Sequence, residues 1–202
     1  MVKVLSGGKD SGLSRFVKSN ASQVSMFIAL IILGLIMSIA SPYFLTWENV
    51  SNLLVYISVS GVMAAGLTVA MLLGGLDVSQ FALLSLCMMV IGILHKAGQP
   101  AYVLILASVA VSAVAGCINA FVITRMKINP IIATIGMQLV YRAGAFLLTN
   151  GEHVFIKDPV FKAIGYNSFL GLPILTWVML GVYGILYYIL KYTSFGRKVY
   201  AV

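Results

Sequence analysis

Charged side chains are scarce in this chain, and acidic ones are the scarcest. Only 5 of its 202 residues are Asp or Glu, and 9% of its residues are charged. By contrast, 61% are hydrophobic and the mean hydropathy is +1.04. A water-soluble domain of this size cannot hide so much apolar surface in its core. The composition therefore excludes an ordinary soluble protein and indicates a membrane protein.

Groups that perform catalysis or hold metals are also few. The two histidines, His95 and His153, fall in different connecting segments, and the two cysteines, Cys87 and Cys117, fall inside apolar stretches. A thiol in such a stretch behaves as a small hydrophobe. No spacing of these residues matches a hydrolase or metal-site motif. We therefore expect a protein that is not an enzyme, with no catalytic residue, metal or cofactor of its own.

Long apolar runs occupy most of the remaining sequence. A helix that crosses a membrane needs about 20 apolar residues, and six runs approach that length: 24–40, 53–73, 81–94, 102–124, 131–148 and 174–190. The pattern predicts an all-α, polytopic integral membrane helix bundle of about six transmembrane helices. The third run is short, so its helix is expected to be tilted or re-entrant.

Basic residues are distributed unevenly between these runs. The net charge of +8 does not indicate nucleic-acid binding, because the basic residues are not interleaved with aromatic ones on one face. Basic residues mark the cytoplasmic side of a membrane protein. If the runs alternate in direction, both termini are cytoplasmic. The residues on that side are Lys3, Lys9, Arg15, Lys18, Arg125, Lys127, Lys191, Arg197 and Lys198.

An aspartate stands between the second and third runs, in the segment Gly74-Gly75-Leu76-Asp77-Val78-Ser79. Acidic residues at membrane depth are rare and mark transport pathways. Paired glycines allow a helix to break so that backbone groups face a cavity, which predicts a break at Gly74-Gly75. Two interpretations of Asp77 stay open. Either it contacts a transported solute, or it caps the third helix and holds the break in place.

Two more polar residues lie inside apolar runs. Asn119 either hydrogen-bonds to a substrate hydroxyl or joins two helices. Arg142 lies in the middle of the fifth run, where it either pairs with Asp77 or extends to the outer lipid headgroups.

Six short segments occur in the order and spacing of a known family. They are Phe44-Leu45-Thr46 with Asn49 and Asn52-Leu53-Leu54; Gly66-Leu67-Thr68; the segment around Asp77; Gly116-Cys117-Ile118-Asn119-Ala120; Asn129-Pro130-Ile131-Ile132-Ala133-Thr134-Ile135-Gly136; and Thr193-Ser194-Phe195-Gly196-Arg197-Lys198-Val199-Tyr200-Ala201. Together they resemble the permease subunits of bacterial ABC sugar importers of the ribose, galactose and xylose type. Gln80-Phe81, Ala120 and Ile131 depart from the family pattern, which leaves the identity of the sugar open.

The resemblance implies a permease of the inner membrane that imports a monosaccharide or similar polyol by alternating access. Its expected partners are ABC ATPase subunits that use the ATP, a second permease subunit, a periplasmic sugar-binding protein and membrane lipid, with no nucleic acid. The resemblance places Asp77, Ser79, Asn119 and Thr134 near the pathway or its helix break. It also implies contact with the ATPase through Phe195, Gly196, Arg197, Lys198 and Tyr200.

The expected organisation is a cytoplasmic tail over residues 1–23, a transmembrane domain over 24–190 and the start of a coupling loop over 191–202. Chains of this family continue past that point, so the resemblance implies a truncated chain. Two rival functions remain open. One is an ion-coupled secondary transporter that uses Asp77 and Arg142, and the other is a truncated membrane subunit that does not transport.

Overall fold

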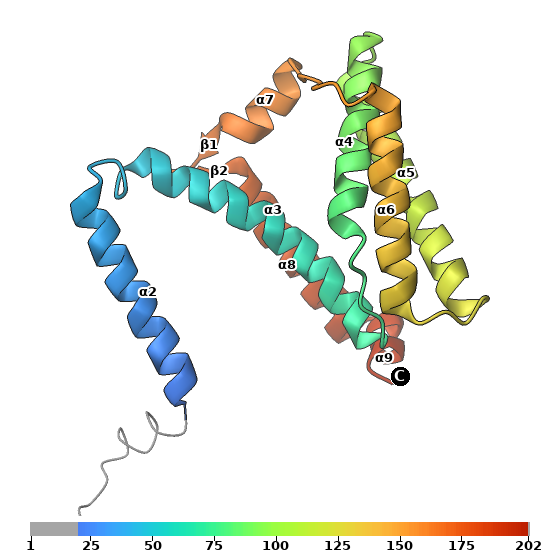
Figure 1. Ribbon diagram of the computed structural model, residues 1–202, viewed down its shortest axis with the longest axis horizontal. Helices are drawn as coiled ribbons and strands as arrows, with labels where there is room; N and C mark the ends of the chain where they lie inside the picture. Colours follow the sequence, from blue (N-terminus) through green and yellow to red (C-terminus); the bar gives the residue numbers. More distant parts are fainter. Residues whose placement is uncertain (1–19, 202) are drawn as a thin grey trace, which may run out of the picture. The chain divides into compact units, whose positions relative to one another are not determined.

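The computed structural model describes residues 20–201 (Figure 1). Most of the predicted tail 1–23, and Val202 at the end of the predicted coupling loop, lie outside the described residues. The chain divides into two compact units, residues 1–50 and 51–202. The predicted transmembrane domain 24–190 therefore extends across the boundary between the two units.

The first unit contains helix α2 (Ala21–Ala40). None of its residues is buried. An apolar helix of 20 residues with every side exposed has the length and surface of a helix that lies in lipid. Helix α3 (Trp47–Leu72) begins in this unit and continues into the second.

The second unit holds the remaining elements, which Figure 1 labels. These are α4 (Gln80–Lys96), α5 (Ala101–Thr124), α6 (Pro130–Thr149), α7 (Pro159–Tyr166), α8 (Ile174–Tyr192) and α9 (Ser194–Val199). A small antiparallel hairpin of β1 (Ser168–Phe169) and β2 (Leu172–Pro173) lies between α7 and α8.

The helices confirm the predicted membrane bundle. Five of them, α2, α3, α5, α6 and α8, are long and apolar enough to cross a membrane. Helix α4 is apolar but has only 17 residues. It is short because the chain between α3 and α4 is not helical over residues 73–79, and this non-helical segment contains the predicted site.

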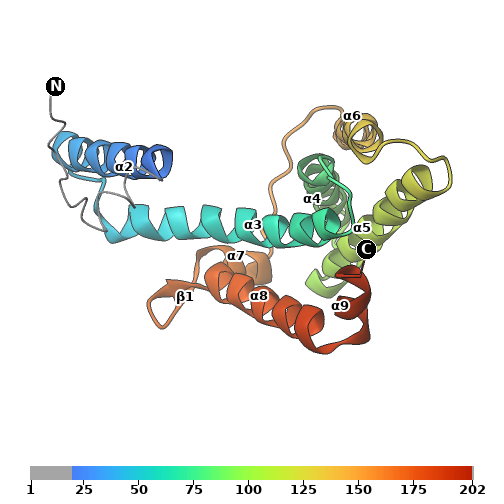
Figure 2. The same cartoon turned by 90° about the horizontal axis from the view of Figure 1, so that it is seen from below.

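Helices α4, α5 and α6 form one packed group, visible from two directions in Figures 1 and 2. Its core consists of Ala82, Ala115 and Tyr141, with Leu83, Leu86 and Met137 packed against it. The two alanines allow the helix backbones to approach closely, which is a common way for membrane helices to pack.

Helices α3 and α8 lie side by side in Figures 1 and 2. Two hydrogen bonds join them. The Ser58 hydroxyl donates to Oγ1 of Thr176 at 3.1 Å, and the Tyr183 hydroxyl donates to the carbonyl oxygen of Gly61 at 3.1 Å. Polar bonds of this kind hold helices together where lipid removes the usual hydrophobic driving force.

Candidate functional site at the break between α3 and α4

The break begins with a glycine turn at the end of α3. Gly74 has φ +80°, a conformation that glycine adopts without steric cost. The N–H of Gly74 donates to the carbonyl of Met71 at 3.0 Å, and the N–H of Gly75 donates to that of Ala70 at 3.0 Å. This pair of bonds is a Schellman motif, a common end of a helix. The predicted break at Gly74-Gly75 is therefore present, and the left-handed turn at Gly74, two residues after Leu72, terminates α3.

Asp77 organises the start of α4. Its Oδ1 accepts hydrogen bonds from the Ser79 N–H at 2.9 Å and from the Ser79 hydroxyl at 2.6 Å. Short polar side chains that bind the backbone two residues later form such turns in front of helices. Ser79 is fully buried, so this bond also gives its hydroxyl an acceptor inside the bundle.

Asn119 and Tyr141 extend the network across α5 and α6. The Asn119 amide Nδ2 donates to the Ser79 hydroxyl at 3.0 Å and lies 3.5 Å from Oδ2 of Asp77. The Tyr141 hydroxyl donates to Oδ1 of Asn119 at 2.7 Å and lies 3.0 Å from the carbonyl oxygen of Ala115. Ser79, Asn119 and Tyr141 are all buried. The network therefore ties the break to both neighbouring helices.

Thr134 holds the non-helical segment from its other side. Its hydroxyl accepts from the N–H of Val78 and donates to the carbonyl oxygen of Leu76, each at 3.2 Å. Inside a membrane these backbone groups have no water to bind. Thr134 is itself only 1% exposed, and it lies in the first turns of α6 because Asn129 caps this helix and Pro130 begins it.

A hollow of about 300 Å³ adjoins the break. Asp77, Asn119, Thr124 and Thr134 are its polar residues, and small or apolar residues such as Gly116, Ala120 and Pro130 form the rest. The residues predicted for the pathway or the break that the structure brings together here are Gly75, Asp77, Ser79, Asn119 and Thr134, with Gly74 at the edge.

Arg142 does not belong to this cluster. It is exposed, and it lines a different hollow with Phe81, Ala82, Ser85 and Gln138. In the part of the chain that the structure describes, the oxygens of Asp77 are bonded to Ser79 and Asn119 and not to a cation. The possible pairing of Asp77 with Arg142 is not formed.

The predicted coupling residues lie on and beside the short helix α9. Thr193 caps it by accepting from the N–H of Gly196 at 3.4 Å. Gly196 is buried, and a β-carbon there would overlap the backbone of Leu190 at the end of α8. The backbones of α8 and α9 are thus in direct contact at Gly196. Phe195, Arg197, Lys198 and Tyr200 are exposed.

Tyr141 completes the network, although the sequence motifs do not single it out. A tyrosine hydroxyl inside an apolar helix needs a hydrogen-bond partner when it is buried, so its position in the fifth run is a usable signal. Helical spacing alone does not identify the partner, because Asn119 lies 22 residues earlier on another helix.

Comparison with known proteins gives the site its context. A family model described as a permease component of the branched-chain amino acid transport system matches residues 49–202. The ribose import permease protein RbsC of Escherichia coli (strain K12) is 32% identical over 195 residues, which are 95% of this chain and 61% of that protein. RbsC of Bacillus subtilis (strain 168) is 35% identical over 178 residues, or 87% of this chain and 55% of that protein.

A third relative is named for a different sugar. The L-arabinose transport system permease protein AraH of Escherichia coli (strain K12) is 28% identical over 180 residues, or 89% of this chain and 55% of that protein. The chain thus spans between 55% and 61% of the length of these three relatives. No solved structure matches it.

The apolar helices, together with the similarity to bacterial permeases, define a multi-pass helical protein of the bacterial inner membrane, of the class of transport permeases. The chain belongs to the family of ABC transport permease components that includes the ribose and L-arabinose permeases, because the family model covers about three quarters of it. Permease components of this kind are not themselves enzymes.

Proposed function

We propose that this chain is the transmembrane subunit of an ATP-driven importer that carries a monosaccharide or similar small polyol by alternating access. The main support is the broken helix between α3 and α4, with its buried polar network, in a chain of this family. Relatives named for ribose and L-arabinose support a sugar as the solute. Broken helices of this kind occur at the binding sites of transporters.

The proposed pathway residues are Gly74, Gly75, Asp77, Ser79, Asn119, Thr134 and Arg142. The hydrogen bonds among Asp77, Ser79, Asn119 and Tyr141 connect α4, α5 and α6. A group of helices joined in this way moves more readily as one body than as separate helices. In this proposal the group rotates to expose the solute-binding surface of these helices first to one side of the membrane and then to the other.

The partners are proposed from the same family. They are ABC ATPase subunits, a second permease subunit and a periplasmic sugar-binding protein, in a lipid membrane. The exposed Phe195, Arg197, Lys198 and Tyr200 form a basic and aromatic surface that suits an acidic groove on the ATPase. Because Gly196 of α9 contacts the backbone of α8, a displacement of α9 is transmitted directly to α8, which is a membrane helix.

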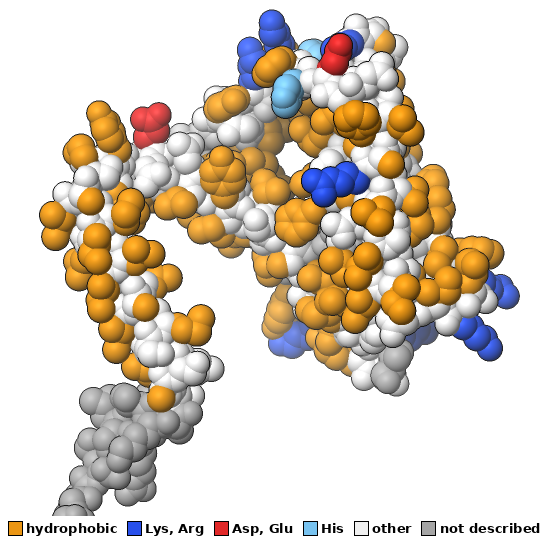
Figure 3. All heavy atoms as spheres, viewed as in Figure 1, with side chains coloured by type: hydrophobic (Ala, Val, Ile, Leu, Met, Phe, Trp, Pro, Cys, Tyr) orange, Lys and Arg blue, Asp and Glu red, His pale blue; other side chains and the backbone are white. Residues whose placement is uncertain are grey.

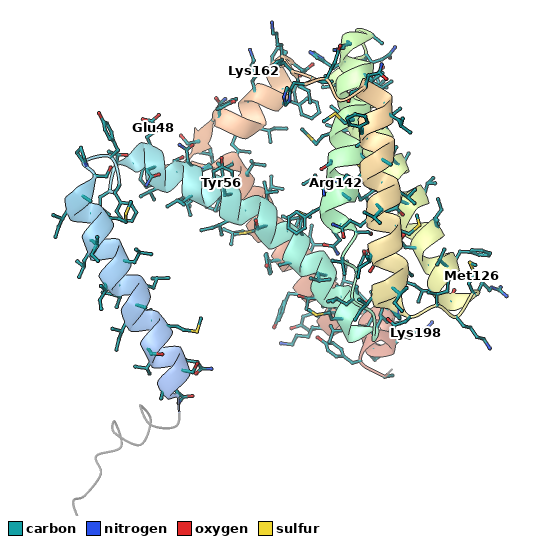
Figure 4. The ribbon with its side chains drawn as sticks, in the orientation of Figure 1. Glu48, Tyr56, Met126, Arg142, Lys162 and Lys198 are labelled. Atoms are coloured by element: carbon teal, nitrogen blue, oxygen red, sulfur yellow. The ribbon has the colours of Figure 1, made fainter. Side chains whose placement is uncertain are left out.

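The orientation follows from the basic side chains of the second unit. Met126 and Lys198 lie near the same end of the helices in Figure 4, so the basic connection after α5 and the basic helix α9 share that end. We assign this end to the cytoplasm by the positive-inside rule. With spans that alternate in direction, we propose that both termini are cytoplasmic, with a tail over 1–23, a transmembrane part over 24–190 and a coupling loop that starts at 191.

An ion-coupled mechanism has less support. It requires a charged pair in the membrane whose proton or cation exchange drives transport. Asp77 is instead bonded to Ser79 and lies beside Asn119, both neutral groups.

Uptake in cells tests the substrate class. A strain without its own ribose and arabinose importers is complemented with the full-length protein and its partner subunits, and uptake of labelled D-ribose, L-arabinose and L-leucine is measured. The proposal predicts uptake of a sugar and none of leucine, which is included because of the description of the family model. Uptake of leucine alone contradicts the proposed substrate class.

A further inference from the structure

Two pairs of side chains face each other across α4 and α6, away from the Asp77 network. Phe81 and Ser85 are four residues apart on α4, and Gln138 and Arg142 are four residues apart on α6. Residues at this spacing lie on one face of a helix. Together with Ala82 they line a hollow of about 200 Å³. We call the hollow lined by these residues the Arg142 hollow.

The Arg142 hollow lies at membrane depth. Arg142 comes seven residues before the end of α6 at Thr149, which places its Cα about 10 Å from that end at 1.5 Å per residue. Figure 4 shows Arg142 at mid-height of the helices, and in the same orientation Figure 3 shows the other visible basic side chains of the second unit toward the ends. Phe81 and Arg142 are exposed and Gln138 is partly exposed.

Contact with lipid is energetically unfavourable for the polar side chains of Arg142 and Gln138. A guanidinium and an amide at membrane depth are costly unless they face protein, water or a polar ligand. The guanidinium offers five hydrogen-bond donors in a plane, the amide offers donors and an acceptor, and the serine hydroxyl offers both. Phe81, with 65% of its surface exposed, adds an apolar ring beside them.

This combination fits a solute that has hydroxyl groups on an apolar carbon skeleton. Sugar hydroxyls accept from the guanidinium and the amide and donate to the amide and serine oxygens. The C–H groups of a sugar ring pack against an aromatic face. Binding sites for small molecules have this composition, with a few convergent polar groups on an apolar wall.

We propose that the Arg142 hollow is the place where a polyhydroxylated solute contacts this permease. The Asp77 network is then the support that fixes the position of α4, and with it Phe81 and Ser85. This inference rests on the proposed function and deepens it, because it assigns solute contact to the Arg142 hollow and not to the hollow beside the break.

Cysteine labelling tests the inference. Gln138→Cys and Ser85→Cys are each introduced into a Cys117→Ala parent, and Leu139→Cys, on a neighbouring and 65% exposed position of α6, is the matched control. Cys87 stays because it is buried. The full-length permease, purified with its ATPase in lipid nanodiscs, is treated with a membrane-impermeant methanethiosulfonate reagent. Labelling is measured with and without D-ribose or L-arabinose and the sugar-binding protein.

The inference predicts that the Gln138→Cys and Ser85→Cys variants are labelled severalfold faster than the Leu139→Cys control, and that the transported sugar slows this labelling. If neither variant is labelled, lipid or another helix covers the hollow, and the inference is wrong. Labelling that no sugar slows also overturns it. Sugar uptake by the unmodified complex is measured in parallel, so that loss of the proposed function is distinguished from loss of this site. Thermal unfolding and a monodisperse elution profile, compared with those of the Cys117→Ala parent, show that each variant has folded.

Discussion

The Tyr141 hydroxyl on α6 donates a 2.7 Å hydrogen bond to the side-chain oxygen of Asn119 on α5. This contact orients the Asn119 amide, because an oxygen that accepts from Tyr141 leaves Nδ2 to donate toward Ser79 and Asp77. The orientation of one side chain therefore connects α6 to the break before α4. The network acts as a unit because each side chain provides a hydrogen-bond partner for the next one.

Removal of the Tyr141 hydroxyl tests this unit. Tyr141→Phe keeps the ring in the core and loses one interhelical hydrogen bond, so we expect the permease to be destabilised by about 0.6 kcal/mol, the average for such bonds in membranes, and by no more than about 1.7 kcal/mol. The measurement is thermal unfolding of the detergent-purified protein. Tyr102→Phe is the control, because Tyr102 is 66% exposed. Equal effects of both changes would contradict a structural role for the buried hydroxyl.

The two interpretations of Asp77 make different predictions for its substitutions. Asparagine retains an oxygen that can accept from Ser79, whereas alanine does not. If Asp77 supports the break, Asp77→Asn keeps most of the sugar uptake and Asp77→Ala loses most of it, together with about 1 kcal/mol of stability, as for the loss of a helix cap. Uptake and thermal unfolding are measured for both. Complete loss of uptake in Asp77→Asn, with normal stability, would show that the charge itself is needed.

Thr134 is expected to keep the segment 76–78 in place through its hydroxyl alone. Thr134→Val preserves the shape of the side chain but leaves the N–H of Val78 and the carbonyl of Leu76 without their partner, at a cost of about 1–3 kcal/mol. Thr134→Ser should restore the bonds. Hydrogen exchange at Val78 is the measurement, with Thr68→Val as the control because the Thr68 hydroxyl bonds within its own helix. Unchanged exchange in Thr134→Val would disprove this role.

Gly196 is expected to be essential for coupling. A β-carbon at this position would overlap the backbone of Leu190, so Gly196→Ala must displace α9, at a cost of about 1–3 kcal/mol for overpacking. We expect the variant to insert in the membrane but to lose sugar-stimulated ATP hydrolysis by the reconstituted complex. Gly184→Ala on α8 is the matched control, because nothing lies within 4 Å of that position. Normal stimulation in Gly196→Ala would show that α9 does not transmit the movement.

Much of the fold can be predicted from the sequence, since membrane helices are set by local composition and caps. The fourth run predicts a helix over 102–124, and α5 covers Ala101–Thr124. Asn129 and Asp158 cap α6 and α7 through their side chains, and both are residue types that favour this position. The paired glycines also predict a break before the short α4, although not that it extends over residues 73–79.

The contacts between helices cannot be predicted in the same way. Hydropathy does not reveal which face of α6 meets α5, so the sequence does not identify Tyr141 and leaves Arg142 as a possible partner of Asp77. Tyr141 and Arg142 are adjacent in sequence, and a helix turns by about 100° per residue, so they face different neighbours. The sequence of α6 alone does not determine which of these two residues faces α5.

ATP-driven sugar import is best tested in a purified system. The full-length permease is reconstituted in proteoliposomes with its ATPase and its sugar-binding protein, with ATP on the ATPase side, and accumulation of labelled D-ribose and L-arabinose is followed with and without a proton uncoupler. We expect accumulation that requires hydrolysable ATP and is unchanged by the uncoupler. Accumulation that stops with the uncoupler while ATP is still present, or that proceeds without ATP, would contradict the proposed mechanism.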